Sequence, residues 1–331
     1  MNSGIVSLLC IASHILVLSL LSARRWKLSH FPASRAVPPW LINLLGVLVA
    51  LATLALPYNE LDDDPLSQCG SRVVSFFYAF KLLDLALTRA CEPPKLRESL
   101  DHDGRSAAFL HHIKYVWFLL TDMRYHHFDI EVVQKGRPSH RVKRRYFISI
   151  ISFYILAAAA YYAPIAETKC LFLLWLIQHG LEGLHAVMHP LCPYNLFHMP
   201  FLAATLGNFW TTQWHASAVF LQSLAYRPGR KVIGRWLGVL AAFALSGVWH
   251  GWAAASLVDE ELAVKLGLQV AVFFVMLGIG TLLERVIWRD QQGGMLQRVL
   301  VWLWALGWAG WCFRTLECHS RIAFLRRACK V

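Results

Sequence analysis

The feature that most constrains this chain is the spacing of its apolar residues. They fall into blocks of roughly 17–22 residues, which is the length that a helix needs to cross the hydrocarbon core of a bilayer. The blocks lie at residues 4–21, 39–56, 72–89, 147–164, 169–188, 236–254, 263–283 and 298–314. We therefore predict an all-α, polytopic membrane protein with about seven or eight transmembrane helices.

Composition and charge support the membrane class. Of the 331 residues, 57% are hydrophobic and only 16% are charged, which is less charged surface than a soluble domain of this length needs. In a soluble protein the net charge of +12 would suggest a nucleic-acid partner. Here the basic residues lie in loops between apolar blocks, as membrane topology requires, so we expect membrane lipids and no nucleic acid as partners.

The charges of the loops predict the orientation in the membrane. Residues 57–71 carry four acidic residues and no basic one, whereas residues 90–146 carry eleven Lys or Arg. This alternation places 22–38, 90–146, 189–235 and 285–297 in the cytosol and the N-terminus in the lumen. The first block is followed by basic residues and is expected to be an uncleaved signal anchor. We expect a multi-pass protein of the endoplasmic reticulum.

The chain is predicted to form a single membrane domain over residues 1–331, because it contains no internal repeat. The cytosolic segment 90–146 is expected to include an amphipathic helix at residues 107–120. In the block at 72–89, Lys81 and Asp84 are three residues apart and can pair on one helical face.

A histidine within the apolar block at 236–254 is the first candidate for chemistry. Polar groups at membrane depth are costly, so they are candidates for function. His250 is flanked by Gly247 and Gly251, and Ser246 lies four residues before it. Gly247 and Ser246 share a helical face with His250, which predicts that a substrate can approach the imidazole closely. The alternative is a histidine that only bonds a neighbouring helix.

An aromatic element upstream is the second candidate. Asn208 and His215 are seven residues apart, which corresponds to two helical turns, so a continuous helix would point both side chains the same way. Trp210 and Trp214 would stack on an adjoining face. The alternative is an aromatic belt that anchors the chain at the lipid headgroups.

The order of these motifs resembles a known family. An F-W-x-x-x-W-H element precedes a basic loop and then an apolar S-G-x-x-H helix, with His215 and His250 35 residues apart. Over about residues 205–252 the chain resembles the wax synthase branch of the membrane-bound O-acyltransferases. The resemblance implies that His250 is the essential histidine and His215 the upstream polar residue. Asn208 lies where plant members carry Asp, and residues 194–254 form the predicted catalytic region.

Within that family, the short length and the F-W-x-x-x-W-H element are most similar to fungal enzymes that O-acetylate terpenoid and meroterpenoid intermediates. The resemblance therefore implies acetyl-CoA or another acyl-CoA as co-substrate, a lipophilic alcohol as acceptor, and neither a bound cofactor nor a metal. One departure is the stretch 128–136, where fungal relatives often carry a glycine-rich R-G-I-G-type sequence.

Each motif is assigned a role in acyl transfer. His250 is predicted to take the hydroxyl proton as general base, because histidine titrates near neutral pH. His215, supported by Asn208, would orient the base or donate to the developing oxyanion. The predicted substrate-binding residues are Trp210, Trp214, Ser246, Gly247 and Trp249. Basic side chains suit phosphates, so the phosphates of the acyl-CoA are expected at Arg227, Arg230, Lys231 and Arg235.

Three other functions stay open from the sequence. A long-chain acyl-CoA:alcohol wax-ester synthase would share the same motifs. A membrane di-iron desaturase or hydroxylase would use histidine boxes, for which Glu182, His185 and His189 are candidates. The pairs at 111–112 and 126–127 do not complete such boxes, because positions 108 and 123 are Ala and Met. A transporter would require paired broken helices and a repeat.

Overall fold

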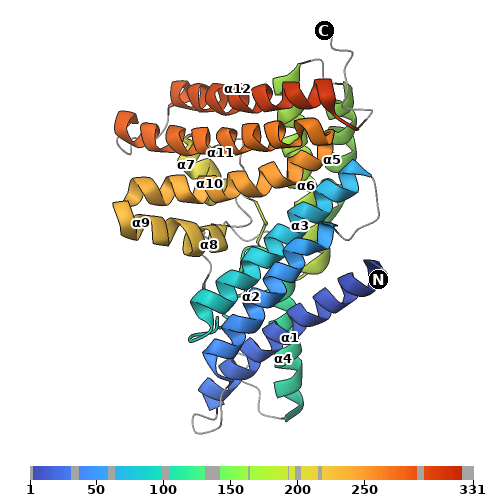
Figure 1. The fold of residues 1–331 in the computed structure, drawn as a ribbon, viewed down its shortest axis with the longest axis vertical. Coiled ribbons are helices and arrows are strands. Elements are labelled where there is room, and N and C mark those ends of the chain that lie inside the picture. The colour runs from blue at the N-terminus through green and yellow to red at the C-terminus, as the bar shows by residue number, and fades with distance from the viewer. Residues whose placement is uncertain are drawn as a thin grey trace. The chain divides into compact units, whose positions relative to one another are not determined.

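The computed structural model describes residues 3–30, 37–58, 64–97, 105–130, 142–162, 165–192, 194–197, 203–214, 218–288 and 294–322. Over these ranges the chain is helical, and its only β-type pairings are two isolated bridges (Figure 1). The predicted all-α class is therefore confirmed.

Six of the described helices are long and apolar enough to cross a membrane. They are Val6–Arg25, Pro39–Tyr58, Ala166–Met188, Arg235–Leu257, Glu260–Trp288 and Met295–His319. Each matches one of the predicted blocks, which confirms a polytopic membrane protein. The blocks at 72–89 and 147–164 are not among them. The second of these forms a helix whose apolar part, Ile150–Ala159, is shorter than a full span.

The chain folds into two compact units, unit 1 with residues 1–63 and 71–132, and unit 2 with residues 64–70 and 133–331. The single membrane domain over 1–331 stays a prediction. The helices of unit 1 are α1 (Ser3–His30), α2 (Pro39–Ala55), η1 (Leu56–Tyr58), most of α3 (Pro65–Leu83), η2 (Asp84–Thr88) and α4 (Arg105–Thr121). Helix α4 covers residues 107–120, where a helix was expected, and its amphipathic character in a cytosolic segment stays a prediction.

In unit 1, α1 packs against α2 and α4. Helix α2 begins at Pro39, whose fixed φ suits the first helical turn and whose missing N–H leaves no donor unsatisfied there. Gly46 lets α2 approach the π-helical turn η2, because a Cβ at this position would overlap Ala86. Lys81 and Asp84 do not pair as expected. Lys81 donates to the backbone oxygens of Leu120 and Asp122, while Asp84 accepts from Thr88 and Arg89.

Unit 2 contains two long helices near its start and three near its end. They are α5 (Val142–Tyr162), α6 (Ala166–Met188), α10 (Arg235–Ala254), α11 (Glu260–Trp288) and α12 (Met295–His319). Shorter elements lie between them, namely α7 (Leu206–Asn208), η4 (Phe209–Gln213), α8 (Ala218–Leu221), η5 (Gln222–Tyr226) and α9 (Arg227–Ile233), and η6 (Ala255–Leu257) follows α10. Helices α10, α11 and α12 lie side by side (Figure 1).

Helix α12 also packs against α6, and two ion pairs join these helices. Lys169 Nζ lies 2.8 Å from Glu317 Oε1 in a buried pair, and Arg314 lies 2.6 Å from Glu167 in a more exposed one. An apolar cluster that includes Ala166, Leu266 and Phe313 surrounds this end of the bundle. The buried pair links α6 to α12, and loss of either buried charge is expected to destabilise this contact.

Candidate active site

The tautomer of His250 follows from its hydrogen bonds. Its Nδ1 lies 2.8 Å from the backbone oxygen of Ser246, one turn earlier in α10, and 3.4 Å from the Ser246 hydroxyl. A carbonyl oxygen can only accept, so Nδ1 carries the proton and donates it to Ser246. The other ring nitrogen, Nε2, is then left as a proton acceptor, which is the state that a general base requires.

Aromatic rings hold the imidazole in place. The His250 ring stacks on Phe274 of α11 at a centroid distance of 4.5 Å, and the Trp249 ring lies 4.8 Å away. Trp249 is itself buried and packs against Phe220 of α8 at 5.9 Å. His250 is only partly buried, so apolar rings pack against the base while part of the residue stays exposed.

The glycines beside His250 have a different role from the one expected. A Cβ at Gly247 would lie 2.9 Å from the backbone oxygen of Ala271, and a Cβ at Gly251 would overlap the backbone of Gly267. Both glycines therefore bring α10 and α11 into close contact. The predicted open space for a substrate beside Gly247 is wrong, because α11 fills it.

The aromatic element is not a continuous α-helix. After the short α7, residues Phe209–Gln213 form the π-helical turn η4, and Trp214 N–H donates to the oxygen of Phe209 five residues earlier at 2.8 Å. A π turn rotates later residues relative to an α-helix, so the shared face predicted for Asn208 and His215 does not follow. His215 itself lies outside the described residues.

The two tryptophans of this element pack in different places. Trp214 stacks on Phe197 at 4.9 Å and on Phe209 at 5.9 Å. Trp210 instead packs edge-on against Phe243 of α10 at 5.9 Å and against Phe274 of α11 at 5.7 Å. The predicted common face for the two indoles is therefore wrong.

Two aromatic contacts join the motifs within unit 2. Trp210 packs directly against Phe243 of α10, and Phe274 of α11 contacts both Trp210 and His250. Phe274 belongs to a buried cluster with Leu206, Leu277 and Val301. The roles assigned to the two motifs imply that they lie close together, and the Phe274 ring that contacts both Trp210 and His250 lies on a third element, α11.

A buried carboxylate that the sequence analysis missed fixes the start of α7. Glu284 of α11 accepts from the backbone N–H groups of Leu206 at 2.6 Å and Gly207 at 3.2 Å. The next N–H, that of Asn208, donates to the Thr205 hydroxyl at 2.9 Å. The signal was a carboxylate directly after the apolar block at 263–283, at the position between that block and the predicted cytosolic stretch 285–297.

The four basic residues assigned to phosphate binding are exposed. Arg227, Arg230 and Lys231 belong to α9, and Arg235 begins α10. Arg235 precedes His250 by fifteen residues of one helix. At about 1.5 Å per residue, that separation is roughly 22 Å along the axis. A donor bound at both places would have to be extended.

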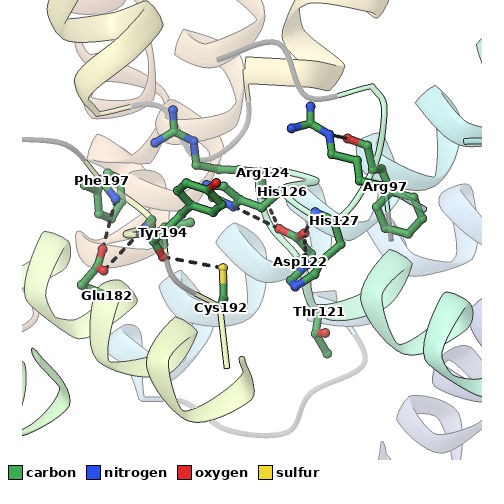
Figure 2. Close-up of polar contacts among 12 residues, drawn as sticks. Arg97, Thr121, Asp122, Arg124, His126, His127, Glu182, Cys192, Tyr194 and Phe197 are labelled. Atoms are coloured by element: carbon green, nitrogen blue, oxygen red, sulfur yellow. Dashed lines mark hydrogen bonds and ion pairs between the residues drawn. The ribbon is translucent and has the colours of Figure 1, made fainter. Parts of the chain in front are cut away.

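Unit 1 has its own polar cluster around Asp122, a fully buried residue after α4. Asp122 accepts from His127 Nδ1 at 2.8 Å and from the backbone N–H groups of Arg124 and His127, and His126 Nδ1 lies 3.5 Å away (Figure 2). Burial acts to raise the pKa of Asp122, but the two histidines outweigh it and hold the pKa well below its usual value.

This pKa predicts an acid-sensitive contribution to stability. A carboxyl whose pKa is lowered on folding stabilises the fold above its unfolded pKa of about 3.9, and this contribution is lost as the pH falls below that value. We expect Asp122→Asn to lower stability by about 1–3 kcal/mol at pH 7, because the amide offers one acceptor oxygen in place of two and leaves buried donors without an acceptor, and by less at pH 3.

Thermal unfolding of the purified protein at pH 7 and pH 3 measures this effect. The exposed Asp259→Asn serves as the matched control and should behave like the wild type at both values. An equal loss in Asp122→Asn at both pH values would contradict the charged state of Asp122.

Glu182, His185 and His189, the candidates for a di-iron site, are not arranged as a set of metal ligands. The rings of His185 and His189 are 5.1 Å apart and both side chains are buried. The Glu182 carboxylate faces backbone donors, the N–H groups of Leu196 and Phe197 (Figure 2). In the described part of the chain, no three His, Cys, Asp or Glu side chains are grouped as ligands of a metal ion.

Comparison with known proteins places the similarity in the same region. Residues 192–276 match the membrane bound O-acyl transferase family. The chain is 30% identical over 132 residues to a probable long-chain-alcohol O-fatty-acyltransferase 7 of Arabidopsis thaliana, which covers 35% of this chain and 38% of the relative. It is 29% identical over 109 residues to a long-chain-alcohol O-fatty-acyltransferase of Simmondsia chinensis, which covers 30% of each. No solved structure matches significantly.

The matched residues contain every predicted site residue from Asn208 to His250 and extend into α11 as far as Met276. The chain spans well under half the length of the curated relatives that it matches. The family match thus covers the aromatic element, α9, α10 and the first half of α11.

Proposed function

We propose that this chain is a membrane O-acyltransferase that moves an acyl group from an acyl-CoA to the hydroxyl group of a lipophilic alcohol. The observation that carries the proposal is His250, whose Nε2 is left as a proton acceptor inside an apolar helix. The match of residues 192–276 to an O-acyltransferase family supports the same chemistry. The membrane would be that of the endoplasmic reticulum, and no bound cofactor is required.

The reaction proceeds in one addition and one elimination. His250 Nε2 takes the proton of the acceptor hydroxyl as the alcohol oxygen bonds to the thioester carbon. The tetrahedral intermediate then collapses, the carbon–sulfur bond breaks, and the proton returns from the imidazolium to the leaving thiolate. Throughout the reaction Nδ1–H stays hydrogen-bonded to the backbone oxygen of Ser246. This bond holds the orientation of the ring and its tautomer.

Two further groups complete the proposed site. Asn208, with His215, would donate to the oxyanion of the intermediate, an interaction worth roughly 3–4 kcal/mol where it has been removed in other enzymes. Trp210, Trp214, Ser246 and Trp249 would line the acceptor site. Arg227, Arg230, Lys231 and Arg235 would bind the phosphates of coenzyme A, because they are exposed at the N-terminal end of the helix that carries His250.

For the transferred group we propose acetyl, and for the acceptor a terpenoid or meroterpenoid intermediate of secondary metabolism. The support is the resemblance of the F-W-x-x-x-W-H element to fungal O-acetyltransferases. A second candidate is a wax-ester synthase, which the names of the two plant relatives favour.

A donor and acceptor panel separates these two candidates. Purified protein in liposomes is incubated with acetyl-CoA or palmitoyl-CoA, and with a sesquiterpenoid alcohol or hexadecanol, and the products are weighed by mass spectrometry. We expect esters that carry one acetyl group on the terpenoid alcohol. Esters formed only from palmitoyl-CoA and hexadecanol would select the wax-ester synthase, and absence of any ester would refute both.

The two rival classes have their own tests. A di-iron desaturase or hydroxylase must contain iron in stoichiometric amounts, which metal analysis of the active protein measures. A transporter would return its cargo with unchanged mass in the same assay. We expect product formation that persists in protein without iron.

A further inference from the structure

We propose that two buried glutamates, Glu182 and Glu284, are positioning residues that hold the aromatic element in the orientation the acyl transfer needs. This inference rests on the proposed function. Both carboxylates are only 7% exposed and come from different long helices, α6 and α11. Each accepts two consecutive backbone N–H groups of the segment between α6 and α8.

Glu284 acts at the start of α7. Its Oε1 accepts from Leu206 N–H and its Oε2 from Gly207 N–H, so both oxygens are used. The first N–H groups of a helix have no partner within the helix, and a negative charge is favoured there. Asn208 follows directly, and its own N–H is bound by Thr205. The Glu284 carboxylate therefore fixes the backbone directly before Asn208 and so helps to position Asn208 and Trp210.

Glu182 acts further upstream. Its Oε1 accepts from Leu196 N–H at 3.2 Å and its Oε2 from Phe197 N–H at 3.0 Å (Figure 2). The Phe197 ring stacks on Trp214, the last described residue of the aromatic element. The second carboxylate thus fixes the other end of the element through one aromatic contact.

Burial of a carboxylate in an apolar helix bundle costs free energy, which strong hydrogen bonds have to offset. Here both glutamates hold short, irregular backbone that the long helices would not otherwise order. The element that they hold carries the proposed oxyanion donor and acceptor-site tryptophans. A small shift of such an element lowers turnover without a matching loss of donor binding, which takes place at α9.

The first arm of the test measures how strongly Glu284 holds the start of α7, and it does not depend on activity. Hydrogen exchange of the full-length protein is compared in wild type, Glu284→Gln and the exposed control Glu261→Gln. Glutamine offers one acceptor oxygen in place of two. We expect faster exchange in residues 203–214 of Glu284→Gln only, with residues 262–275 of α11 unchanged as the sign of an intact fold. Unchanged exchange in 203–214 would overturn the proposal.

The second arm is a double-mutant cycle in kcat. Glu284→Gln should lower kcat about 10- to 100-fold with little change in KM for acyl-CoA, whereas Glu261→Gln should not. If Glu284 acts through Asn208, adding Glu284→Gln to Asn208→Ala should cause almost no further loss. If the losses in kcat of the two single variants were fully additive, or if Glu284→Gln raised only KM, Glu284 would have a purely structural role. Either result would refute Glu284 as a positioning residue.

Glu182→Gln provides the same test through Phe197 and Trp214 if Glu284→Gln does not fold. It should raise exchange in residues 194–197 and lower kcat over the same range, and an active variant with wild-type kcat would count against the proposal. A wild-type protein that forms no ester refutes the proposed function. In that case faster exchange in the variants shows a structural clamp alone, and the positioning role falls with the function.

Discussion

Replacement of His250 by alanine is expected to lower ester formation by about 10²- to 10⁴-fold while the protein still inserts and folds. The alanine variant loses the nitrogen that accepts the hydroxyl proton. Its fold should survive, because the Ser246 oxygen that bonds Nδ1 already belongs to the hydrogen-bond ladder of α10. Initial rates with saturating acyl-CoA and acceptor measure the effect, and thermal unfolding in the same detergent checks the fold.

His179→Ala is the matched control for this experiment. His179 also lies in an apolar helix, α6, and is partly buried, but it lies outside the residues that match the O-acyltransferase family. The control should keep nearly full activity. A His250→Ala protein with wild-type turnover would remove the proposed base, and an equal loss in His179→Ala would show that the assay follows stability.

The second large effect is expected on stability, at the contact between α10 and α11. Gly251→Ala should destabilise the protein by about 1–3 kcal/mol, because its Cβ would overlap the backbone of Gly267, which cannot turn aside as a side chain can. In a protein of this size, such a loss lowers Tm by several degrees. Size-exclusion chromatography after heating measures Tm in detergent.

Gly307→Ala separates this packing effect from the intrinsic preference of alanine for helices. Gly307 lies in α12, and a Cβ there would meet no atom within 4 Å. Alanine favours a helix over glycine by up to about 1 kcal/mol, so this variant should be neutral or more stable. If Gly251→Ala and Gly307→Ala shifted Tm by the same amount, the result would contradict the close approach of α10 and α11.

Local patterns predicted a large part of the fold. The apolar blocks located six helices that can span a membrane, with ends within a few residues of those observed, because length and composition alone decide that property. The predicted spans at 72–89 and 147–164 have no counterpart among these six helices. The first contains the buried charges Lys81 and Asp84, which bind partners within unit 1 and not each other.

The site was predictable as far as it is local. His250 and Ser246 are one helical turn apart, and their contact follows from the sequence. The role of Gly247 does not, because its neighbour Ala271 lies on the next helix. The π-helical turn η4 leaves no signal in side-chain periodicity. Glu284 accepts a hydrogen bond from Leu206 N–H, although the two residues are 78 positions apart. No motif in a single sequence predicts a contact at that separation.

Acyl transfer to a lipophilic alcohol at His250 is measured in liposomes that contain the purified full-length protein, acyl-labelled acetyl-CoA and a terpenoid alcohol. Ester and free coenzyme A are measured together. We expect equimolar ester and coenzyme A from the wild type and neither from His250→Ala above background. Release of coenzyme A with free acetate and no ester, or no consumption of the donor by the wild type, would contradict acyl transfer at His250.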